Sequence, residues 1–129
     1  FLLVAQSKAK MAAHNKFGKA GEEMAAEWLC RHGFELLARN WRSGRLEIDI
    51  IASRNAVLHF VEVKSRHDDL FGLPEDWVGK KKMRHLLKAG VAYQEKYPAW
   101  DLVQYDILSI LVDQNGKPDF FFIEDVYCW

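Results

Sequence analysis

Apolar residues change their spacing along this chain, and the changes predict an order of helices and strands. Apolar and small residues recur at helical spacing from about Asn15, a suitable N-cap, to His32, and Gly33 is suited to end that helix. A second helical pattern covers about residues 80–96. The remaining apolar residues form short runs that are typical of strands. These runs are Phe34–Trp41, Leu46–Ala52, Val57–Lys64, Leu102–Val112 and Phe120–Ile123.

The predicted order of one helix, three strands, one helix and two strands indicates an α/β fold, with helices covering a mixed central sheet. The chain has 129 residues, half of them hydrophobic, which suits a single domain with a sizeable core. We expect residues 16–129 to form that domain. Residues 1–15 are interpreted as an N-terminal extension that is disordered or was added for expression, because the chain begins at Phe1 and Met11 could be a natural start.

Membrane, redox and charge features of the sequence favour a cytoplasmic protein. No apolar run is long enough to span a membrane. Cys30 and Cys128 lie far apart and form no CxxC pattern, so we expect two free thiols in a reducing compartment. The formal net charge is zero. This balance argues against a protein that coats nucleic acid by bulk charge, but it is compatible with a local basic surface.

Acidic residues interrupt the two apolar runs that form a predicted hairpin. Glu47 and Asp49 lie in the first run and Glu62 in the second, and Lys64 follows Glu62 by two positions. A charge inside a half-buried strand carries a desolvation penalty unless something compensates it. One compensation would be a divalent cation. The alternative is a solvent-facing hairpin whose charges form cross-strand pairs.

Strand periodicity gives this hairpin an expected register. Side chains alternate faces, so Asp49 and Ile51 should share one face, and Ile48 and Ile50 the other. A loop of about four residues, 53–56, would place Asp49 opposite Phe60. It would place Glu47 opposite Glu62. Asp49 and Glu62 would then be diagonal neighbours, roughly 7–8 Å apart at Cα, and one cation between their side chains could bridge that gap.

Each helix adds charged residues to this picture. Glu22 lies on a stripe of small and apolar residues, so we expect it to pack inward and Glu23 to face solvent; alternatively, Glu22 is a boundary residue near the helix start. The second helix should bury Met83, Leu86, Leu87, Gly90, Val91 and Tyr93. Lys82 stands at the border of this apolar face. The open side carries Lys80, Lys81, Arg84, His85 and Lys88. That basic surface is either a phosphate-binding patch or an ordinary solvated helix face.

Carboxylates on adjacent strands suit Mg²⁺, which prefers oxygen ligands and keeps several waters. Such an ion can lower the pKa of a bound water and stabilise charge on a phosphate. Lys64, on the same strand face as Glu62, could orient the water or neutralise developing charge. Asp49, Glu62 and Lys64 therefore outline a phosphodiesterase site, which Glu22 could join. Glu47 is either an accessory acid of this site or the partner of a basic side chain such as Lys64.

Several segments together resemble the YraN-like family of uncharacterised bacterial proteins. They are Gly18-Lys19-Ala20-Gly21-Glu22 with Ala25, Asn40-Trp41-Arg42, the sequence EIDIIA at 47–52, FVEVKSR at 60–66, Phe71-Gly72 with Pro74, Lys82, and Tyr105-Asp106. The chain departs from the family pattern at Leu46, where glycine is usual, and at Gln104, where arginine is usual. The family looks like a branch of the PD-(D/E)XK nuclease superfamily.

This resemblance implies a restriction-endonuclease-like core with the order α-β-β-β-α-β, followed here by a short C-terminal strand. It implies that Glu22, Asp49 and Glu62 are the metal-binding acids and Lys64 the catalytic lysine, with Lys82 at a basic position in the following helix.

The resulting hypothesis is a nuclease, dependent on Mg²⁺ or Mn²⁺, that hydrolyses phosphodiester bonds in structured or branched DNA, or alternatively RNA. The residues expected to contact nucleic acid are Lys80, Lys81, Lys82, Arg84, Lys88 and Arg66. One alternative is a nucleic-acid-binding module with little activity alone, which acts with a partner or as a homodimer that doubles the basic surface. Another is a structural protein whose hairpin acids form a charged ladder.

Overall fold

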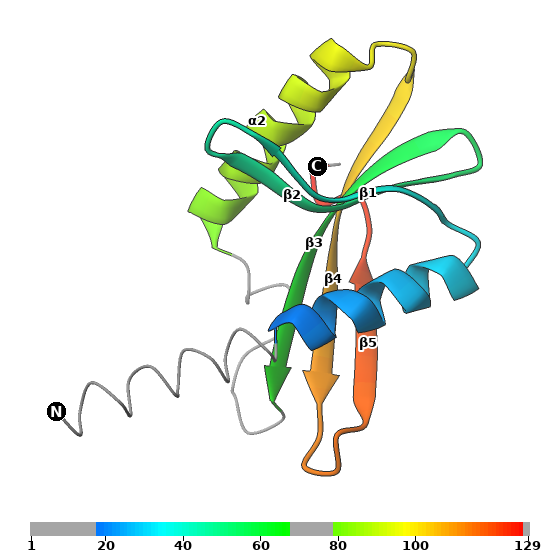
Figure 1. Ribbon diagram of the computed structural model, residues 1–129, viewed down its shortest axis with the longest axis vertical. Helices are drawn as coiled ribbons and strands as arrows, with labels where there is room; N and C mark the ends of the chain where they lie inside the picture. Colours follow the sequence, from blue (N-terminus) through cyan, green and yellow to red (C-terminus); the bar gives the residue numbers. More distant parts are fainter. Residues whose placement is uncertain (1–17, 68–78, 128–129) are drawn as a thin grey trace, which may run out of the picture.

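In the part of the chain that the structure describes, a five-stranded sheet forms the middle layer, with one helix on each face. The computed structural model describes residues 18–67 and 79–127, which are coloured in Figure 1. An N-terminal helix covers residues 18–31. The other elements are β1 (Glu35–Ser43), β2 (Leu46–Arg54), β3 (Val57–His67), α2 (Lys80–Lys96), β4 (Leu102–Val112) and β5 (Pro118–Ile123).

The predicted α/β class and order of elements are confirmed. α2 and β4 have the predicted bounds, and the other four strands extend two or three residues beyond one predicted end. Neither helix in the described ranges has the length and hydrophobicity needed to cross a membrane. Cys30 is exposed and free. Some predictions fall outside the described residues: the extension, the helix start at Asn15, the segment from Phe71 to Pro74, and Cys128.

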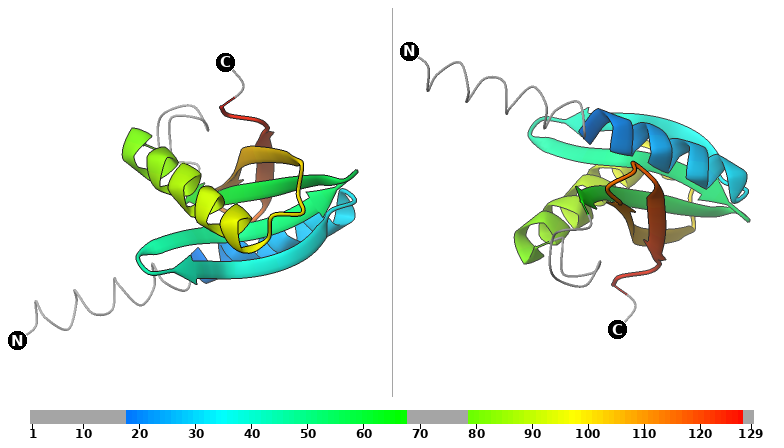
Figure 2. Two further views of the ribbon diagram at one scale, coloured as in Figure 1. Left: turned by 90° about the horizontal axis from the view of Figure 1, so that it is seen from above. Right: turned by 90° about the horizontal axis from the view of Figure 1, so that it is seen from below.

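The sheet is mixed, as predicted. Its strand order follows the chain, β1-β2-β3-β4-β5, and only β3 and β4 run parallel. A parallel pair needs a crossover connection, and α2 lies in that connection. The views in Figure 2 show the N-terminal helix on one side of the sheet and α2 on the other.

Each helix covers its own apolar core. The N-terminal helix contributes Ala25, Ala26 and Leu29 to a core with Val61, Leu108 and Ile110. On the other face, α2 contributes Leu86, Ala89 and Tyr93 to a core with Leu58, Phe60 and Tyr105. Gly90 lets α2 approach the sheet, because a Cβ there would collide with the Tyr105 ring. The prediction that Leu87 and Val91 are buried was wrong. Both are exposed, 40% and 47% respectively, because each directly follows a residue of the row that touches the sheet and is rotated about 100° from it.

The predicted register of the β2–β3 hairpin was also wrong. Ile51 pairs with Phe60, so the strands are shifted by two residues from the prediction that Asp49 faces Phe60 and Glu47 faces Glu62. The cause is the turn, which has two residues rather than four. Asn55 and Ala56 both have positive φ, 53° and 65°, as a type I′ hairpin turn requires.

Side-chain alternation in β2 breaks at Asp49. Ile48 and Ile51 both pack in the core beneath α2, whereas Ile50 packs in the core beneath the N-terminal helix. The prediction that Ile48 and Ile50 share a face was therefore wrong. Asn40, on the neighbouring strand, has a φ of 50° and lies between the pairs Arg39↔Ile50 and Trp41↔Ile48. A local backbone irregularity thus spans β1 and β2 at the level of Asp49.

A buried polar pair joins β3 to β4. His59 Nδ1 lies 2.6 Å from Asp106 Oδ2, and the side chains are 3% and 0% exposed. The other oxygen of Asp106 accepts hydrogen bonds from Gln104 Nε2, at 3.1 Å, and from the backbone N–H of Asp125, at 2.9 Å. Asp106 therefore ties two strands and the segment after β5 to one buried carboxylate.

Substituting Asp106→Ala should destabilise the protein strongly, because His59 and two N–H donors would lose a buried acceptor. Each buried group that is left without its hydrogen-bond partner typically costs about 1–3 kcal/mol of unfolding free energy. Chemical denaturation monitored by circular dichroism measures this loss. Asp119→Ala, at an exposed position on β5, is the control and should stay within about 0.5 kcal/mol of the wild type. Equal stabilities of the two variants would contradict the assigned role of Asp106.

Candidate active site

The candidate site lies where β2 separates from β3. Pairing between these strands runs from Arg54↔Val57 to Ile50↔Val61, whereas β3 continues beside β4 as far as His67↔Val112. Figure 1 shows the β1–β2 hairpin turning away from the lower half of β3. Beyond the last pair, the backbone N–H of Val63 donates a hydrogen bond to Asp49 Oδ2 at 2.9 Å. A side chain of β2 thus replaces a missing backbone partner at the fork.

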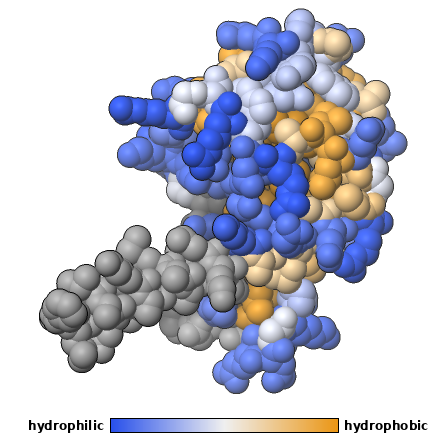
Figure 3. All heavy atoms as spheres, viewed as in Figure 1, coloured by the Kyte–Doolittle hydropathy of each residue, from blue (hydrophilic) through white to orange (hydrophobic). Residues whose placement is uncertain are grey.

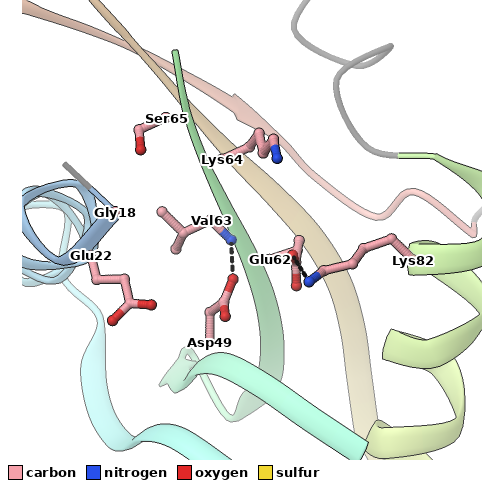
Figure 4. Close-up of a pocket in the computed structure, with 8 residues that line it drawn as sticks. All are labelled: Gly18, Glu22, Asp49, Glu62, Val63, Lys64, Ser65 and Lys82. Atoms are coloured by element: carbon pink, nitrogen blue, oxygen red, sulfur yellow. Dashed lines mark hydrogen bonds and ion pairs between the residues drawn. The ribbon is translucent and has the colours of Figure 1, made fainter. Parts of the chain in front are cut away.

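A cavity of about 190 Å³ opens at this fork. Its lining residues are Gly18, Glu22, Asp49, Glu62, Val63, Lys64, Ser65 and Lys82. They come from the N-terminal helix, β2, β3 and α2 (Figure 4). The structure therefore brings together all four residues predicted for the catalytic and metal site, namely Glu22, Asp49, Glu62 and Lys64.

Two carboxyl groups crowd one another in this cavity. Glu62 is 4% exposed, and burial, with the nearby Asp49 carboxylate, raises its pKa from 4.5 to about 8. Burial also raises the pKa of Asp49, although the hydrogen bond from Val63 opposes the shift. Lys82 Nζ lies 3.3 Å from Glu62 Oε1 and partly offsets the charge. Burial and mutual repulsion thus disfavour having both acids ionised.

The two lysines of the cavity differ in their electrostatic surroundings. Glu62 raises the pKa of Lys82, which keeps its ammonium group charged. Burial lowers the pKa of Lys64, and the nearby cations Arg66 and Lys82 lower it further. Sequence reasoning assigned Lys82 to nucleic-acid contact at the edge of the apolar face. The structure places it in the cavity as the ion-pair partner of Glu62.

Glu22 reaches the cavity from the N-terminal helix. The helix lies close to β3 because Gly21 has no side chain; a Cβ there would lie 2.6 Å from Ser65 Oγ. Glu22 is half-buried and points toward Asp49 across the cavity (Figure 4). Its Oε2 accepts a hydrogen bond from Asn40 Nδ2 at 3.3 Å. Glu23 is exposed and pairs with Arg39 instead, so the predicted difference between the two acids is confirmed.

The other predicted site residues lie around the cavity rather than in it. Glu47 is not among the described residues that line the cavity; it pairs with Arg42, its Oε1 lying 3.5 Å from Nη2. Lys80, Lys81, Arg84 and Lys88 are exposed on α2, and Arg66 is half-buried on β3. Hydrophilic side chains project at the upper left of Figure 3, where Figure 1 shows α2.

Three acids share the cavity without forming a ready-made ligand cage. Within residues 18–67 and 79–127, no group of three or more His, Cys, Asp and Glu side chains is arranged closely enough to hold a metal ion. Asp49 and Glu62 are the neighbouring pair, and Glu22 faces them from the opposite wall. An ion held by Asp49 and Glu62 would therefore need further oxygen ligands, such as water or a backbone carbonyl.

These features define an α/β protein with a mixed sheet and with acids and lysines gathered at a strand fork, consistent with a restriction-endonuclease-like core. The family model described as "Uncharacterised protein family UPF0102" matches residues 21–110. The chain belongs to this family, which is the YraN family, and the resemblance predicted from its motifs is confirmed. The matched range includes the acids and lysines of the cavity.

Similar proteins occur in several bacteria, each named as a UPF0102 protein. One from Bacteroides fragilis is 40% identical over 116 residues, covering 90% of this chain and 93% of the relative. One from Flavobacterium johnsoniae is 43% identical over 111 residues, covering 83% and 89%. One from Chloroherpeton thalassium is 36% identical over 119 residues, covering 86% and 92%. The similarity thus extends over most of each protein.

The raised pKa of Glu62 predicts that stability falls as pH rises. Between pH 4.5 and about 8 the folded state binds more of the Glu62 proton than the unfolded state, which has released it. The stabilisation is therefore present at low pH and lost through this window. Glu62→Gln stays neutral, so without metal it should gain on the wild type by at least about 1 kcal/mol between pH 5 and 8, the value of roughly one pKa unit. Denaturation at each pH measures the difference.

Glu47→Gln provides the control for this measurement, because Glu47 is an exposed acid outside the cavity. Its stability should follow the wild-type pH dependence. Parallel curves for the wild type and Glu62→Gln would contradict the assigned protonation of the buried pair.

Proposed function

We propose that this protein is a metal-dependent nuclease that hydrolyses phosphodiester bonds in structured or branched DNA, with RNA as the alternative substrate. The observation that carries the proposal is the cavity at the strand fork. There, the buried carboxyl group of Glu62 and the half-buried carboxyl group of Asp49 lie with Lys64 around one space. Acids and a lysine in this arrangement suit charge stabilisation at a phosphate better than a purely structural role, because burying paired acids destabilises the fold.

The donor set fits Mg²⁺ or Mn²⁺. Asp49 and Glu62 offer carboxylate oxygens, and Mg²⁺ is usually held by one or two carboxylates together with several waters. Burial raises the pKa of both acids, and the Asp49 carboxylate raises that of Glu62 further; a divalent cation between them would offset both effects. Glu22, on the opposite wall (Figure 4), would accept a hydrogen bond from a water bound to that ion. When bound, the ion would polarise a water and stabilise negative charge on the phosphate.

The remaining side chains of the cavity have different roles at the scissile phosphate. Lys64 Nζ orients the attacking water or stabilises charge that develops on the phosphate, and burial lowers the pKa of Lys64. Lys82 pairs with Glu62 and holds that carboxylate in place. Exposed cations on α2 contact phosphates of the nucleic acid that lie farther from the cleaved bond.

Wild-type protein should cleave branched or flapped DNA in the presence of Mg²⁺ or Mn²⁺, and Glu62→Gln and Lys64→Ala should each lose about 100-fold or more of the rate. Gel assays with labelled branched, flapped and single-stranded DNA and RNA measure this. Glu95→Gln, an exposed acid near the end of α2, is the matched control and should retain wild-type activity. Equal cleavage by wild type and Glu62→Gln would identify a contaminating nuclease and remove the support for the proposal.

A nucleic-acid-binding module is the second candidate, and the basic surface of α2 favours it. Four exposed cations, Lys80, Lys81, Arg84 and Lys88, lie within its first nine residues. A homodimer would double this surface for a two-stranded substrate. Binding without cleavage by wild type under all metal conditions would favour this function over the nuclease.

Both functions predict that binding depends on salt through α2. The triple variant Lys81→Ala/Arg84→Ala/Lys88→Ala should weaken DNA binding and reduce the slope of log K against log salt by about 0.9 for each phosphate that the variant no longer neutralises. Fluorescence anisotropy at several salt concentrations measures the slope. A control triple, Arg31→Ala/Lys96→Ala/Lys117→Ala, removes the same formal charge outside the first nine residues of α2. If both triples had the same effect, the start of α2 would not be the binding surface.

A further inference from the structure

Asn40 interrupts β1 beside the part of β2 that carries Asp49. It adopts a φ of 50° and lies between the pairs Arg39↔Ile50 and Trp41↔Ile48. Few residues other than glycine adopt this left-handed conformation, and asparagine is among those that tolerate it best. The irregularity therefore has a local cause in the sequence, at the level of the candidate site.

The left-handed residue changes where consecutive side chains point. In a regular strand, neighbouring side chains face opposite sides of the sheet. Here Arg39 Nη2 lies 2.8 Å from Glu23 Oε1, and Asn40 Nδ2 donates to Glu22 Oε2 at 3.3 Å. Two successive side chains of β1 thus bind two successive acids of the N-terminal helix, which regular alternation would not allow.

These two contacts differ in their effect on charge. The Arg39 guanidinium neutralises Glu23, which is exposed. The amide of Asn40 is neutral, so it fixes one oxygen of Glu22 and leaves the carboxylate its negative charge. Glu22 in turn points into the cavity toward Asp49 (Figure 4). An amide donor is thus suited to an acid that must be oriented and still attract a cation.

We propose that Asn40 is a positioning residue, whose left-handed backbone and side-chain amide hold the Glu22 carboxylate toward Asp49 and Glu62. The inference rests on the proposed function, because it gives Glu22 a part in cation binding. Asn40 acts through Glu22 and does not touch the ion or the substrate.

Metal affinity tests the role of the amide without relying on activity. Asn40→Gly keeps a residue that accepts the left-handed backbone but removes the donor. We expect Mn²⁺ affinity, measured by electron paramagnetic resonance titration, to fall about tenfold, the low end for loss of a hydrogen-bonding group that supports a metal site. Asn55→Gly is the matched control, because Asn55 also has a positive φ, of 53°, but lies in the β2–β3 turn. It should bind Mn²⁺ like the wild type.

A double-variant cycle shows whether Asn40 acts through Glu22. In the Glu22→Ala background, Asn40→Gly should cause no further decrease in Mn²⁺ affinity. Thermal unfolding without metal gives a second readout: Asn40→Gly should lower Tm by about 2–4 °C in the wild-type background and by clearly less in Glu22→Ala.

The outcomes separate this inference from the proposed function. If the wild type binds Mn²⁺ and Asn40→Gly binds it equally well, the positioning role is overturned and the metal site stands. If the wild type binds no Mn²⁺, the proposed metal site fails. The double-variant cycle in Tm without metal then tests the contact between Asn40 and Glu22. Additive changes in Tm would overturn the orientation of Glu22 by Asn40.

Discussion

Burial of two neighbouring carboxylates at the fork between β2 and β3 is the constraint on which the site depends. Asp49 and Glu62 would repel one another and lose hydration, so their surroundings must compensate them. The Val63 N–H does so for Asp49, and the Lys82 ammonium for Glu62. The first donor is free for this role because backbone pairing between the strands stops at Ile50↔Val61. The polar site therefore begins where the backbone pairing of β2 with β3 ends.

The fork also explains how helices on opposite faces of a sheet contribute to one cavity. Glu22 comes from the N-terminal helix and Lys82 from α2, and an unbroken sheet would separate them. A glycine allows each helix to approach the sheet closely: Gly21 lies against Ser65, and Gly90 against Tyr105. Both approaches depend on the two apolar cores, so the packing of apolar side chains decides where the charged side chains lie.

Local patterns in the sequence identified the acids of the candidate site, but they predicted the strand register and the side-chain faces less well. Acids inside apolar runs and a helical stripe containing Glu22 are properties of neighbouring residues, and the structure brings these residues together. The hairpin register was missed because Asn55-Ala56 lacks the glycine that normally signals a two-residue turn. The prediction that Ile48 and Ile50 share a face failed because simple alternation of side chains does not account for a left-handed residue on the adjacent strand. The contact between His59 and Asp106 depends on parallel pairing across 47 positions, which no local pattern encodes.

Parallel pairing of β3 with β4 has a consequence for how the chain acquires its structure. β1, β2 and β3 are contiguous, so this meander can assemble from local contacts. β3, however, has no neighbour on its other side until Leu102–Val112 arrives after α2. During synthesis, a strand carrying Phe60 and Val61 would wait as an unpaired edge, the kind of surface that recruits other chains. Rapid synthesis of α2 and β4 would therefore shorten the time in which the nascent protein can self-associate. Slow translation between residues 67 and 102 would prolong the exposure of the β3 edge.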